Sequence, residues 1–189
     1  MTTTREVVAA DDATLIGRSL HEPEIFAVLF DRHAPLLHRY VTRRLGPGEA
    51  EDVVADTFLA AFQSRGAYDR GRPDARPWLY GIASNMIGRR RRAETGLYRA
   101  YLRSGVHPGE IAGARVEDGV NTLAVNRPLA RALLRLKRAD RDVLLLVAWA
   151  GLTYQEVADA LAIPPGTVAS RLNRARAQIR QSLGEGERR

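Results

Sequence analysis

Apolar residues recur at helical spacing over two separate stretches of this 189-residue chain, and this pattern limits the fold more than any other feature. In the first stretch, from 24 to 93, they fall three to four positions apart, as at Leu37, Val41 and Leu45. The second stretch, from 127 to 183, repeats the pattern. Neither stretch shows the alternation of apolar and polar residues that is typical of β-strands. The sequence therefore predicts an all-α fold made of two small helical domains.

The segment between the two stretches differs in composition. It has five glycines and few regularly spaced apolar residues, which is typical of a flexible linker that can include a short helix over 97–102. The predicted organisation, in chain order, is a flexible N-terminal arm over 1–20, a four-helix domain over 21–93, the linker over 94–126, a second helical domain over 127–183 and a tail over 184–189.

Prolines, glycines and capping residues set the expected ends of the helices. Pro35 is predicted to end a short first helix and to start a second one, which runs to the Gly-Pro-Gly segment at 46–48. In the C-terminal domain, Asp140 is expected to cap a helix that is closed by Gly151. Two further helices are predicted in the first domain, over 49–64 and 77–92.

Charge and composition narrow the class of protein. The chain has 29 basic and 22 acidic residues, so its net charge is 29 − 22 = +7, which favours a polyanionic partner. It has no cysteine, which excludes disulfides and thiol chemistry. The longest apolar run, over 143–150, is too short to cross a bilayer. The first residues also lack the layout of a secretion signal. We therefore predict a cytoplasmic protein with no membrane insertion of its own.

Motifs of common enzymes are missing from the sequence. No GxxxxGK[ST], GxSxG or HExxH string occurs. The four histidines form no obvious ligand set, since His33 and His38 are five positions apart rather than four. The sequence therefore predicts a protein that binds rather than catalyses, with no catalytic residues, metal site or cofactor.

The most specific pattern lies between 152 and 183. Thr153 and Glu156 form a capping box that opens a short helix, the chain breaks at 162–164, and Pro165 starts a long helix. This layout predicts a helix-turn-helix. On the long helix, one apolar stripe is spaced at 4, 3 and 4 positions and is expected to pack inward; it consists of Val168, Leu172, Ala175 and Ile179.

The opposite face of the same helix is polar and bordered by arginines. Ser170, Asn173 and Arg174 are positioned to reach base edges in a major groove, and the flanking arginines are positioned to reach phosphates. A solvated arginine-rich face is the alternative, but the cap, break, stripe and polar face together favour duplex DNA binding. The residues assigned to it are Thr167, Ser170, Arg171, Asn173, Arg174 and Arg176.

An acidic surface is predicted on the helix over 49–64. Glu49, Asp52 and Asp56 share one face, with Leu59 at its margin, while Phe58 belongs to the inward side. Acids gathered in a basic protein suit a positively charged protein surface, with Leu59 as an apolar anchor. The alternative is that these acids complement the helix dipole, which does not account for Asp56, two turns into the helix.

The helix over 77–92 ends in four consecutive arginines. A cluster of this kind binds phosphates or, alternatively, complements the helix C-terminus. We expect Trp78, Ile82, Ala83 and Met86 to be buried and Tyr80, Ser84, Asn85, Gly88 and Arg91 to be exposed. Together with Tyr68 in the preceding loop, this surface suits single-stranded DNA with an unstacked base. The residues assigned to it are Tyr68, Ser84, Asn85, Arg89, Arg91 and Arg92.

Three segments resemble the bacterial RNA polymerase sigma factors of the extracytoplasmic-function (ECF) type, the minimal two-domain branch of the sigma-70 family. EDVVADTF (51–58) resembles the family's polymerase-binding helix, and WLYGIASN (78–85) resembles the helix that reads and melts the minus-ten element. GLTYQEVADALAIPPGTVASRLNRAR (151–176) resembles its minus-thirty-five reader. The chain differs from the usual pattern at Ala55, Arg89 and Ala169, of which Arg89 makes its helix more basic.

The resemblance implies a division of the chain into sigma region 2 and sigma region 4. It implies that the acidic helix docks on the clamp helices of the polymerase largest subunit through Glu49, Asp52, Asp56, Phe58 and Leu59. It also implies that region 2 captures the minus-ten element, that region 4 reads the minus-thirty-five element, and that an anti-sigma protein inhibits both. The alternative is a stand-alone helix-turn-helix regulator that binds duplex DNA without polymerase.

Overall fold

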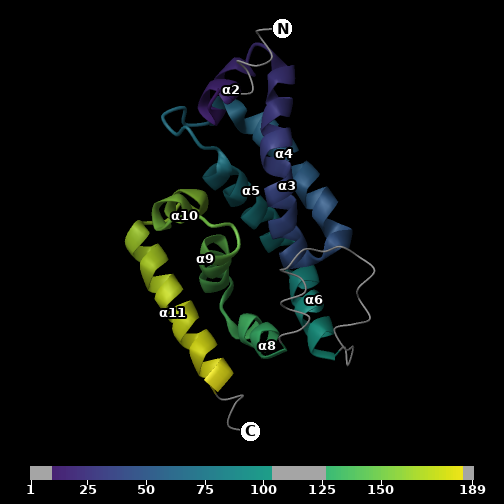
Figure 1. Ribbon diagram of the computed structural model, residues 1–189, viewed down its shortest axis with the longest axis vertical. Coiled ribbons are helices and arrows are strands. Elements are labelled where there is room, and N and C mark those ends of the chain that lie inside the picture. Colours follow the sequence, from purple (N-terminus) through teal and green to yellow (C-terminus); the bar gives the residue numbers. More distant parts are fainter. Residues whose placement is uncertain (1–9, 104–126, 185–189) are drawn as a thin grey trace.

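The computed structural model describes residues 10–103 and 127–184, without the side chains of Arg91, Ala93 and Tyr101. Every regular element in these two ranges is helical, as expected for an all-α protein (Figure 1). None of the helices in these ranges is both long and apolar enough to cross a membrane. In chain order they are α2 (Asp12–Arg18), η1 (Pro23–Ile25), α3 (Phe26–Leu45), α4 (Pro47–Ser64), η2 (Arg65–Ala67), α5 (Arg76–Arg89), α6 (Arg91–Arg103), α8 (Arg127–Arg135), α9 (Arg138–Ala148), α10 (Tyr154–Leu161) and α11 (Pro165–Gly184).

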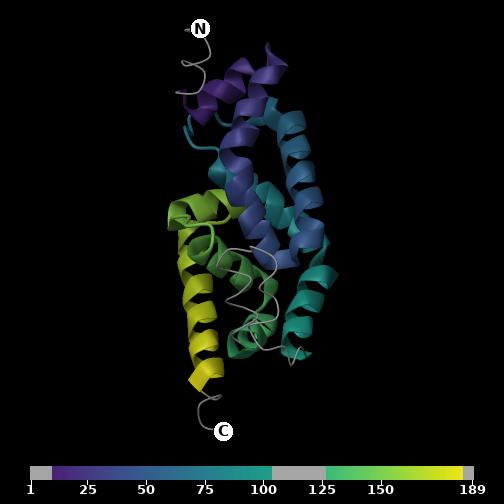
Figure 2. The same cartoon turned by 45° about the vertical axis from the view of Figure 1, so that its right-hand side comes forward.

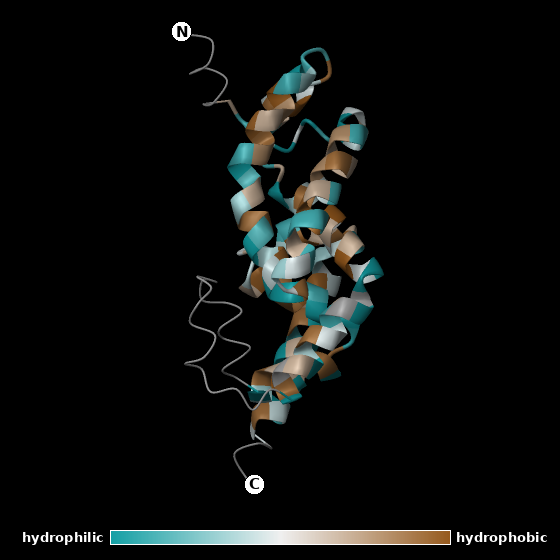
Figure 3. Cartoon of the chain, turned by 90° about the vertical axis from the view of Figure 1, so that its right-hand side faces the viewer, coloured by the Kyte–Doolittle hydropathy of each residue, from teal (hydrophilic) through white to brown (hydrophobic). Residues whose placement is uncertain are grey.

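The N-terminal domain is built on α3, α4 and α5, which pack against one another (Figure 2). Each helix presents an apolar face to the others, and brown and teal residues accordingly alternate around the helices in Figure 3. The centre of this packing is buried almost completely and consists of Leu29, Leu37, Val41, Ala50, Val53, Ala61, Leu79 and Ala83.

Pro35 lies inside α3 rather than between two helices, so the predicted break is wrong. A proline inside a helix loses one backbone hydrogen bond and costs about 3 kcal/mol. The apolar stripe nevertheless continues across it from Leu29 through Leu37 to Val41, and all three side chains are buried. Burying side chains of this size contributes roughly 1.5–3 kcal/mol each. Continuous packing against α4 therefore outweighs the local cost of the proline.

Part of the predicted N-terminal arm is folded. Residues 12–18 form α2, with Asp11 as its N-cap, and Leu15 and Ile16 are fully buried. Asp12, 3% exposed, connects α2 to the rest of the domain. Its carboxylate bonds to His33 Nε2 at 2.7 Å and accepts hydrogen bonds from Arg32 at 2.6 Å and from the Ala75 backbone N–H at 2.8 Å. The loop before α5 is therefore held by a residue of the predicted arm.

Burial alone would raise the pKa of the Asp12 carboxyl, but hydrogen bonds from His33 and Ala75 outweigh it and lower the pKa below 3.8. Because this pKa is lower in the folded than in the unfolded state, the ionised carboxylate stabilises the fold at pH values above its ordinary pKa. This stabilisation is lost as the pH falls through the folded-state pKa. We therefore expect Asp12→Asn to lower the free energy of unfolding at neutral pH by about 2 kcal/mol. In urea unfolding at a series of pH values, Asp12→Asn should lose less stability than the unchanged chain when the pH falls below 3.8. The same dependence on pH in both proteins would contradict this role of Asp12.

The predicted linker begins too early. The helix predicted over 77–92 ends at Arg89 as α5, and α6 then continues to Arg103. Residues 94–103, predicted as linker, are therefore helical, and the short helix expected over 97–102 is the second half of α6. Glu94 and Tyr98 of α6 are buried. The remainder of the predicted linker lies outside the described residues, as do residues 1–9 of the predicted arm and residues 185–189 of the predicted tail.

The C-terminal domain consists of α8 to α11. The predicted capping box is present, with Thr153 Oγ accepting from Glu156 N and Glu156 Oε2 accepting from Thr153 N. Pro165 starts α11, as predicted. Asp140 is not a cap, however, because α9 begins two residues earlier and Asp140 sits inside its first turn, where it is buried. There it bonds to Arg174 instead.

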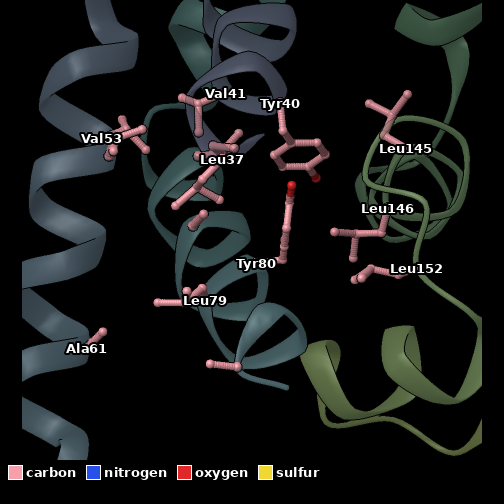
Figure 4. Packing of buried hydrophobic residues seen from close by; sticks show 14 of the residues in the cluster. Leu37, Tyr40, Val41, Val53, Ala61, Leu79, Tyr80, Leu145, Leu146 and Leu152 are labelled. Carbon is pink, nitrogen blue, oxygen red and sulfur yellow. The ribbon is translucent and has the colours of Figure 1, made fainter. Parts of the chain in front are cut away.

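The two domains share one continuous core. Helix α10 packs on α5, α8 packs on α6, and Tyr40 and Tyr80 meet edge to face at 5.1 Å. In Figure 4 the two tyrosines lie between the N-terminal core and Leu145, Leu146 and Leu152 of the C-terminal domain.

Charged residues also cross this domain interface. Arg44 of α3, 1% exposed, bonds to Glu94 Oε1 of α6 at 2.8 Å and to Asp142 Oδ1 of α9 at 2.7 Å. Arg141 bonds to the other Glu94 oxygen at 3.2 Å. Burial would lower the pKa of Arg44, but Tyr40 and the two carboxylates outweigh it and raise the pKa, so the guanidinium stays charged. We call Arg44, Glu94, Arg141 and Asp142 the interdomain ion cluster.

Candidate nucleic-acid interface

Helix α11 separates an inward apolar stripe from an outward polar face. Val168, Leu172 and Ala175 are fully buried against the domain, and Ile179 is partly buried. Ser170, Asn173 and Arg174 are exposed, as the sequence predicts. Of the other residues assigned to this face, Arg176 is exposed, whereas Thr167 and Arg171 are half-buried at its edge.

Arg174 is held by a carboxylate of the neighbouring helix. Its Nη2 bonds to Asp140 Oδ1 at 3.0 Å, while the side chain remains 60% exposed. This hydrogen bond is the main reason that the pKa of Arg174 is raised. The contact fixes the guanidinium at the surface of α11, which reduces the number of side-chain conformations that Arg174 must give up to bind a base.

The acidic face of α4 has a counter-charge that sequence reasoning missed. Arg90 lies across it, with nitrogen–oxygen distances of 3.4 Å to Glu49, 3.9 Å to Asp52 and 3.3 Å to Asp56. The side chains of Asp52 and Asp56 nevertheless remain 73% and 55% exposed. One arginine of the run therefore faces α4 instead of DNA, and the acidic face keeps a net negative charge.

Phe58 lies on the inward side of α4, as the helical pattern predicts, and not at the docking surface that the family resemblance implies for it. Phe58 is 5% exposed and packs edge to face on Phe30 at 4.9 Å, so it belongs to the core and offers no surface for a partner. Leu59 is 56% exposed, as predicted, and Phe30 is 45% exposed. Next to them, α3 and α4 enclose an apolar hollow of about 430 Å³ that is lined by Phe30, Ala34, Pro35, Val54 and Ala55, with Asp31, His38 and Glu51 at its rim.

Tyr68 forms the wall of a small cavity rather than an exposed stacking surface. It is 8% exposed, its hydroxyl donates to the carbonyl oxygens of Arg72 at 2.7 Å and Asp74 at 3.2 Å, and its ring lies 4.9 Å from that of Trp78. Burial raises the pKa of Tyr68 to about 12, so it stays a neutral donor. The cavity, about 220 Å³, is lined by Ala67, Tyr68, Asp69, Arg72, Asp74, Pro77, Trp78 and Asp159.

Helix α5 is oriented differently from the prediction. Tyr80 and Ser84, expected at the surface, are 5% and 1% exposed, because the C-terminal domain packs on this side of the helix. Trp78, Ile82 and Met86, expected in the core, are only partly buried, whereas Ala83 is fully buried. Asn85 and Arg89 are exposed, as expected. The helix is therefore rotated about its axis relative to the sequence interpretation.

The arginine run continues as a basic surface onto α6. Arg92 is exposed, while the side chain of Arg91 is not described. An open basic hollow of about 960 Å³ is lined by Arg89, Arg92, Thr95 and Arg99. Sequence reasoning missed Thr95 and Arg99, because it assigned these positions to the linker. Thr95 lies three positions after Arg92, and Arg99 lies four positions after Thr95; this helical spacing is the sequence signal that the basic face continues. Within the described residues, no group of three or more acidic or histidine side chains is arranged to hold a metal.

Comparisons with known proteins match both domains of the chain to one family. Residues 29–96 match the family model of sigma-70 region 2, and residues 126–179 match that of sigma-70 region 4. The chain is 34% identical over 178 residues to the ECF RNA polymerase sigma factor SigL of Mycobacterium tuberculosis, covering 92% of this chain and 97% of that one. It is 29% identical to the ECF sigma factor SigK of Mycolicibacterium vanbaalenii, covering 94% and 91% of the two chains.

A solved structure of CnrH in complex with the cytosolic domain of CnrY superposes with a TM-score of 0.64 at 26% identity and covers 92% of this chain and 97% of CnrH. The matches confirm the resemblance seen in the sequence and favour a sigma factor over a stand-alone regulator. The chain belongs to the sigma-70 family and is an RNA polymerase sigma factor of the ECF type, a factor for promoter-specific initiation of transcription.

Proposed function

We propose that three separate surfaces of this sigma factor perform its three binding tasks. The acidic face of α4, formed by Glu49, Asp52 and Asp56 with Leu59, binds the clamp helices of core RNA polymerase. Two observations support this assignment: the exposed carboxylates keep a net negative charge, and an apolar hollow adjoins them. A basic partner surface with an apolar side chain complements both features.

The polar face of α11 reads the minus-thirty-five element as duplex DNA. The observation that carries this proposal is the exposure of Ser170, Asn173 and Arg174 directly opposite a fully buried stripe. An α-helix fits the major groove of B-DNA, and a guanidinium donates two hydrogen bonds to one guanine. Arg176 and Arg171 at the border reach phosphates, while Thr167 contacts the duplex at the start of the helix.

The surface around α5 holds the melted minus-ten element. The cavity between Tyr68 and Trp78 accepts an unstacked base, and Asn85 lies on the same exposed side of α5. Arg89 and Arg92, extended by Arg99, bind the backbone phosphates. Ser84 and the side chain of Arg91 are assigned to the same element from the sequence.

Arg174→Ala tests the reading face. In a complex with core polymerase, it should weaken binding to the best minus-thirty-five sequence by about 1–3 kcal/mol and leave other sequences nearly unaffected. Arg176→Ala is the matched control, because loss of a phosphate contact weakens all sequences equally and lowers the salt dependence. Competition binding over a randomised upstream element measures both variants. If Arg174→Ala weakened binding to every sequence equally, Arg174 would contact a phosphate rather than a base.

We further propose that the chain acts in the cytoplasm by binding rather than catalysis, and that a protein inhibitor of the anti-sigma class controls it. The superposition on CnrH, which was solved with the cytosolic domain of CnrY, supports the second point. Core polymerase mixed with the purified chain should select defined start sites on a genomic template, which is read by sequencing the transcripts. Specific duplex binding by the chain alone, with no start-site choice by polymerase, would contradict the proposal.

A further inference from the structure

Arg174 is paired with a buried carboxylate in a way that sets its orientation. Helix α9 packs against α11 (Figure 1), which brings Asp140, 5% exposed, next to the outward face of α11. Both carboxylate oxygens take part, since Arg174 Nη2 donates to Oδ1 at 3.0 Å and Nε donates to Oδ2 at 3.4 Å. Two parallel bonds of this kind define the orientation of the planar guanidinium. Asp140 therefore fixes the direction in which the guanidinium points as well as its position.

The pairing leaves one edge of the guanidinium for a ligand. A guanidinium has five N–H donors, and Asp140 accepts hydrogen bonds from two of them. The others are on Nη1 and Nη2, and two of these are parallel at the end of the side chain, away from the carboxylate. The side chain of Arg174 is 60% exposed. A pair of parallel donors is therefore presented at the surface that faces the duplex in the proposed function.

Guanine is the base that matches this edge. In the major groove, guanine presents two adjacent acceptors, N7 and O6, whereas adenine and cytosine present an amino donor and thymine presents a single acceptor. Two parallel donors therefore make two hydrogen bonds with guanine alone. An arginine that is free to rotate can turn to another base or to a phosphate instead. Selection of guanine consequently depends on the fixed orientation.

The same pairing makes Arg174 less suited to a phosphate. The charges of Arg174 and Asp140 offset each other, so the pair attracts a phosphate less than a lone arginine does. Within the part of the chain that the structure describes, the other arginines of α11 form no ion pair; they are Arg171, Arg176 and Arg180. Helix α11 therefore combines one oriented, neutralised arginine with three that keep their full charge for the DNA backbone.

From this geometry we propose that Asp140 is a positioning residue for promoter recognition: it holds Arg174 so that the free edge reads a guanine of the minus-thirty-five element. The inference rests on the proposed role of α11 in reading that element, and it adds the identity of the base. Asp140 is buried and acts through Arg174 without touching DNA. In a purely structural role, Arg174 would only neutralise a buried carboxylate, and loss of Asp140 would change stability but not base preference.

Two variants remove the positioning contact. Asp140→Ala deletes both acceptors and should still fold, because Arg174 is exposed enough to be hydrated and alanine favours a helix more than aspartate does. Asp140→Asn keeps the size of the side chain but offers one acceptor oxygen instead of two. The double variant, Asp140→Ala with Arg174→Ala, shows whether Asp140 acts through Arg174, because effects of residues that act through one another are not additive.

The test measures the preference among the four bases at each position of a randomised minus-thirty-five element, in complexes of the full chain with core polymerase. Arg174→Ala should abolish a preference for guanine at one position, which identifies the contacted base pair. Both Asp140 variants should reduce the same preference by about fivefold or more, since a bidentate arginine–guanine contact discriminates roughly ten- to hundredfold. The double variant should lose no more than Arg174→Ala alone.

This preference is a ratio measured within one protein. The positive charge that the Asp140 variants add, and any decrease in the folded fraction, affect binding to every sequence equally and therefore cancel. A change in the ratio consequently reports the orientation of Arg174 and not the stability of the domain.

A guanine preference that both Asp140 variants keep would overturn the proposal. A preference for a base other than guanine at the Arg174 position would also overturn it, and so would additive losses in the double variant. In these three cases the base-reading role of Arg174 still stands, because Arg174→Ala alters selectivity. If Arg174→Ala weakens binding to every sequence equally, the proposed reading role of Arg174 fails, and the positioning role of Asp140 fails with it.

Discussion

Reversing two charges on α4, by Asp52→Arg together with Asp56→Arg, is expected to weaken binding to core RNA polymerase by about a hundredfold or more. Close charge pairs across an interface have coupling energies of about 1.5 kcal/mol or more each, and every 1.4 kcal/mol changes the affinity about tenfold. Both side chains are more than half exposed, so the fold should be retained. Co-purification and a binding titration with core enzyme measure the effect.

The matched control reverses two exposed acids elsewhere in the same domain, by Glu22→Arg with Glu24→Arg. It adds the same total charge and should leave polymerase affinity nearly unchanged. Equal weakening by both pairs would mean that overall charge, rather than the acidic face of α4, governs the association.

Arg44→Met should uncouple the two domains. It removes the cation that Glu94 and Asp142 share and leaves them with Arg141 and Arg138 respectively. Removing one partner of a buried ion pair in this way costs about 3–5 kcal/mol. The two tryptophans report the domains separately, because Trp78 lies on α5 and Trp149 follows α9. In the unchanged chain both should report one unfolding transition, and in Arg44→Met the two transitions should separate. Urea titrations of Trp78→Phe and Trp149→Phe versions follow each domain alone.

Two companion variants separate lost charge balance from lost packing. Arg43→Met removes a neighbouring, only partly buried arginine and should keep the transitions together. Adding Asp142→Asn to Arg44→Met leaves the buried Glu94–Arg141 pair, so the charges of the cluster balance again, and this should restore much of the coupling. Transitions that remain coincident in Arg44→Met itself would show that the apolar contacts alone hold the domains together.

Local chemistry explains which parts of the fold were predictable from the sequence. The capping box at Thr153 and Glu156, Pro165 at the start of α11 and the stripe from Val168 to Ala175 each depend on residues within two turns of one another. The helix-turn-helix and its exposed reading residues therefore match the structure. The capping function expected of Asp140 is wrong because α9 begins two residues earlier, and its carboxylate bonds to a distant residue, Arg174, instead.

The remaining differences arise where burial depends on the other domain. Tyr80 and Ser84 are polar side chains on a helix beside a basic run, and nothing near them in the sequence indicates that the C-terminal domain packs on this helix. Arg44 did carry a signal: it follows Leu37 and Tyr40 at helical spacing and so places a charge on an apolar stripe. Such a charge predicts a buried partner, although not that the partner belongs to the second domain.

The bond between Arg174 and Asp140 ties promoter choice to the integrity of the C-terminal domain. Asp140 is 5% exposed, so a substitution that removes the arginine leaves a carboxylate largely cut off from water and without its cation. A duplicated gene that evolves a new preference at position 174 must therefore also replace residue 140 or accept a less stable domain. Among diverged copies of this factor, the two positions should change together.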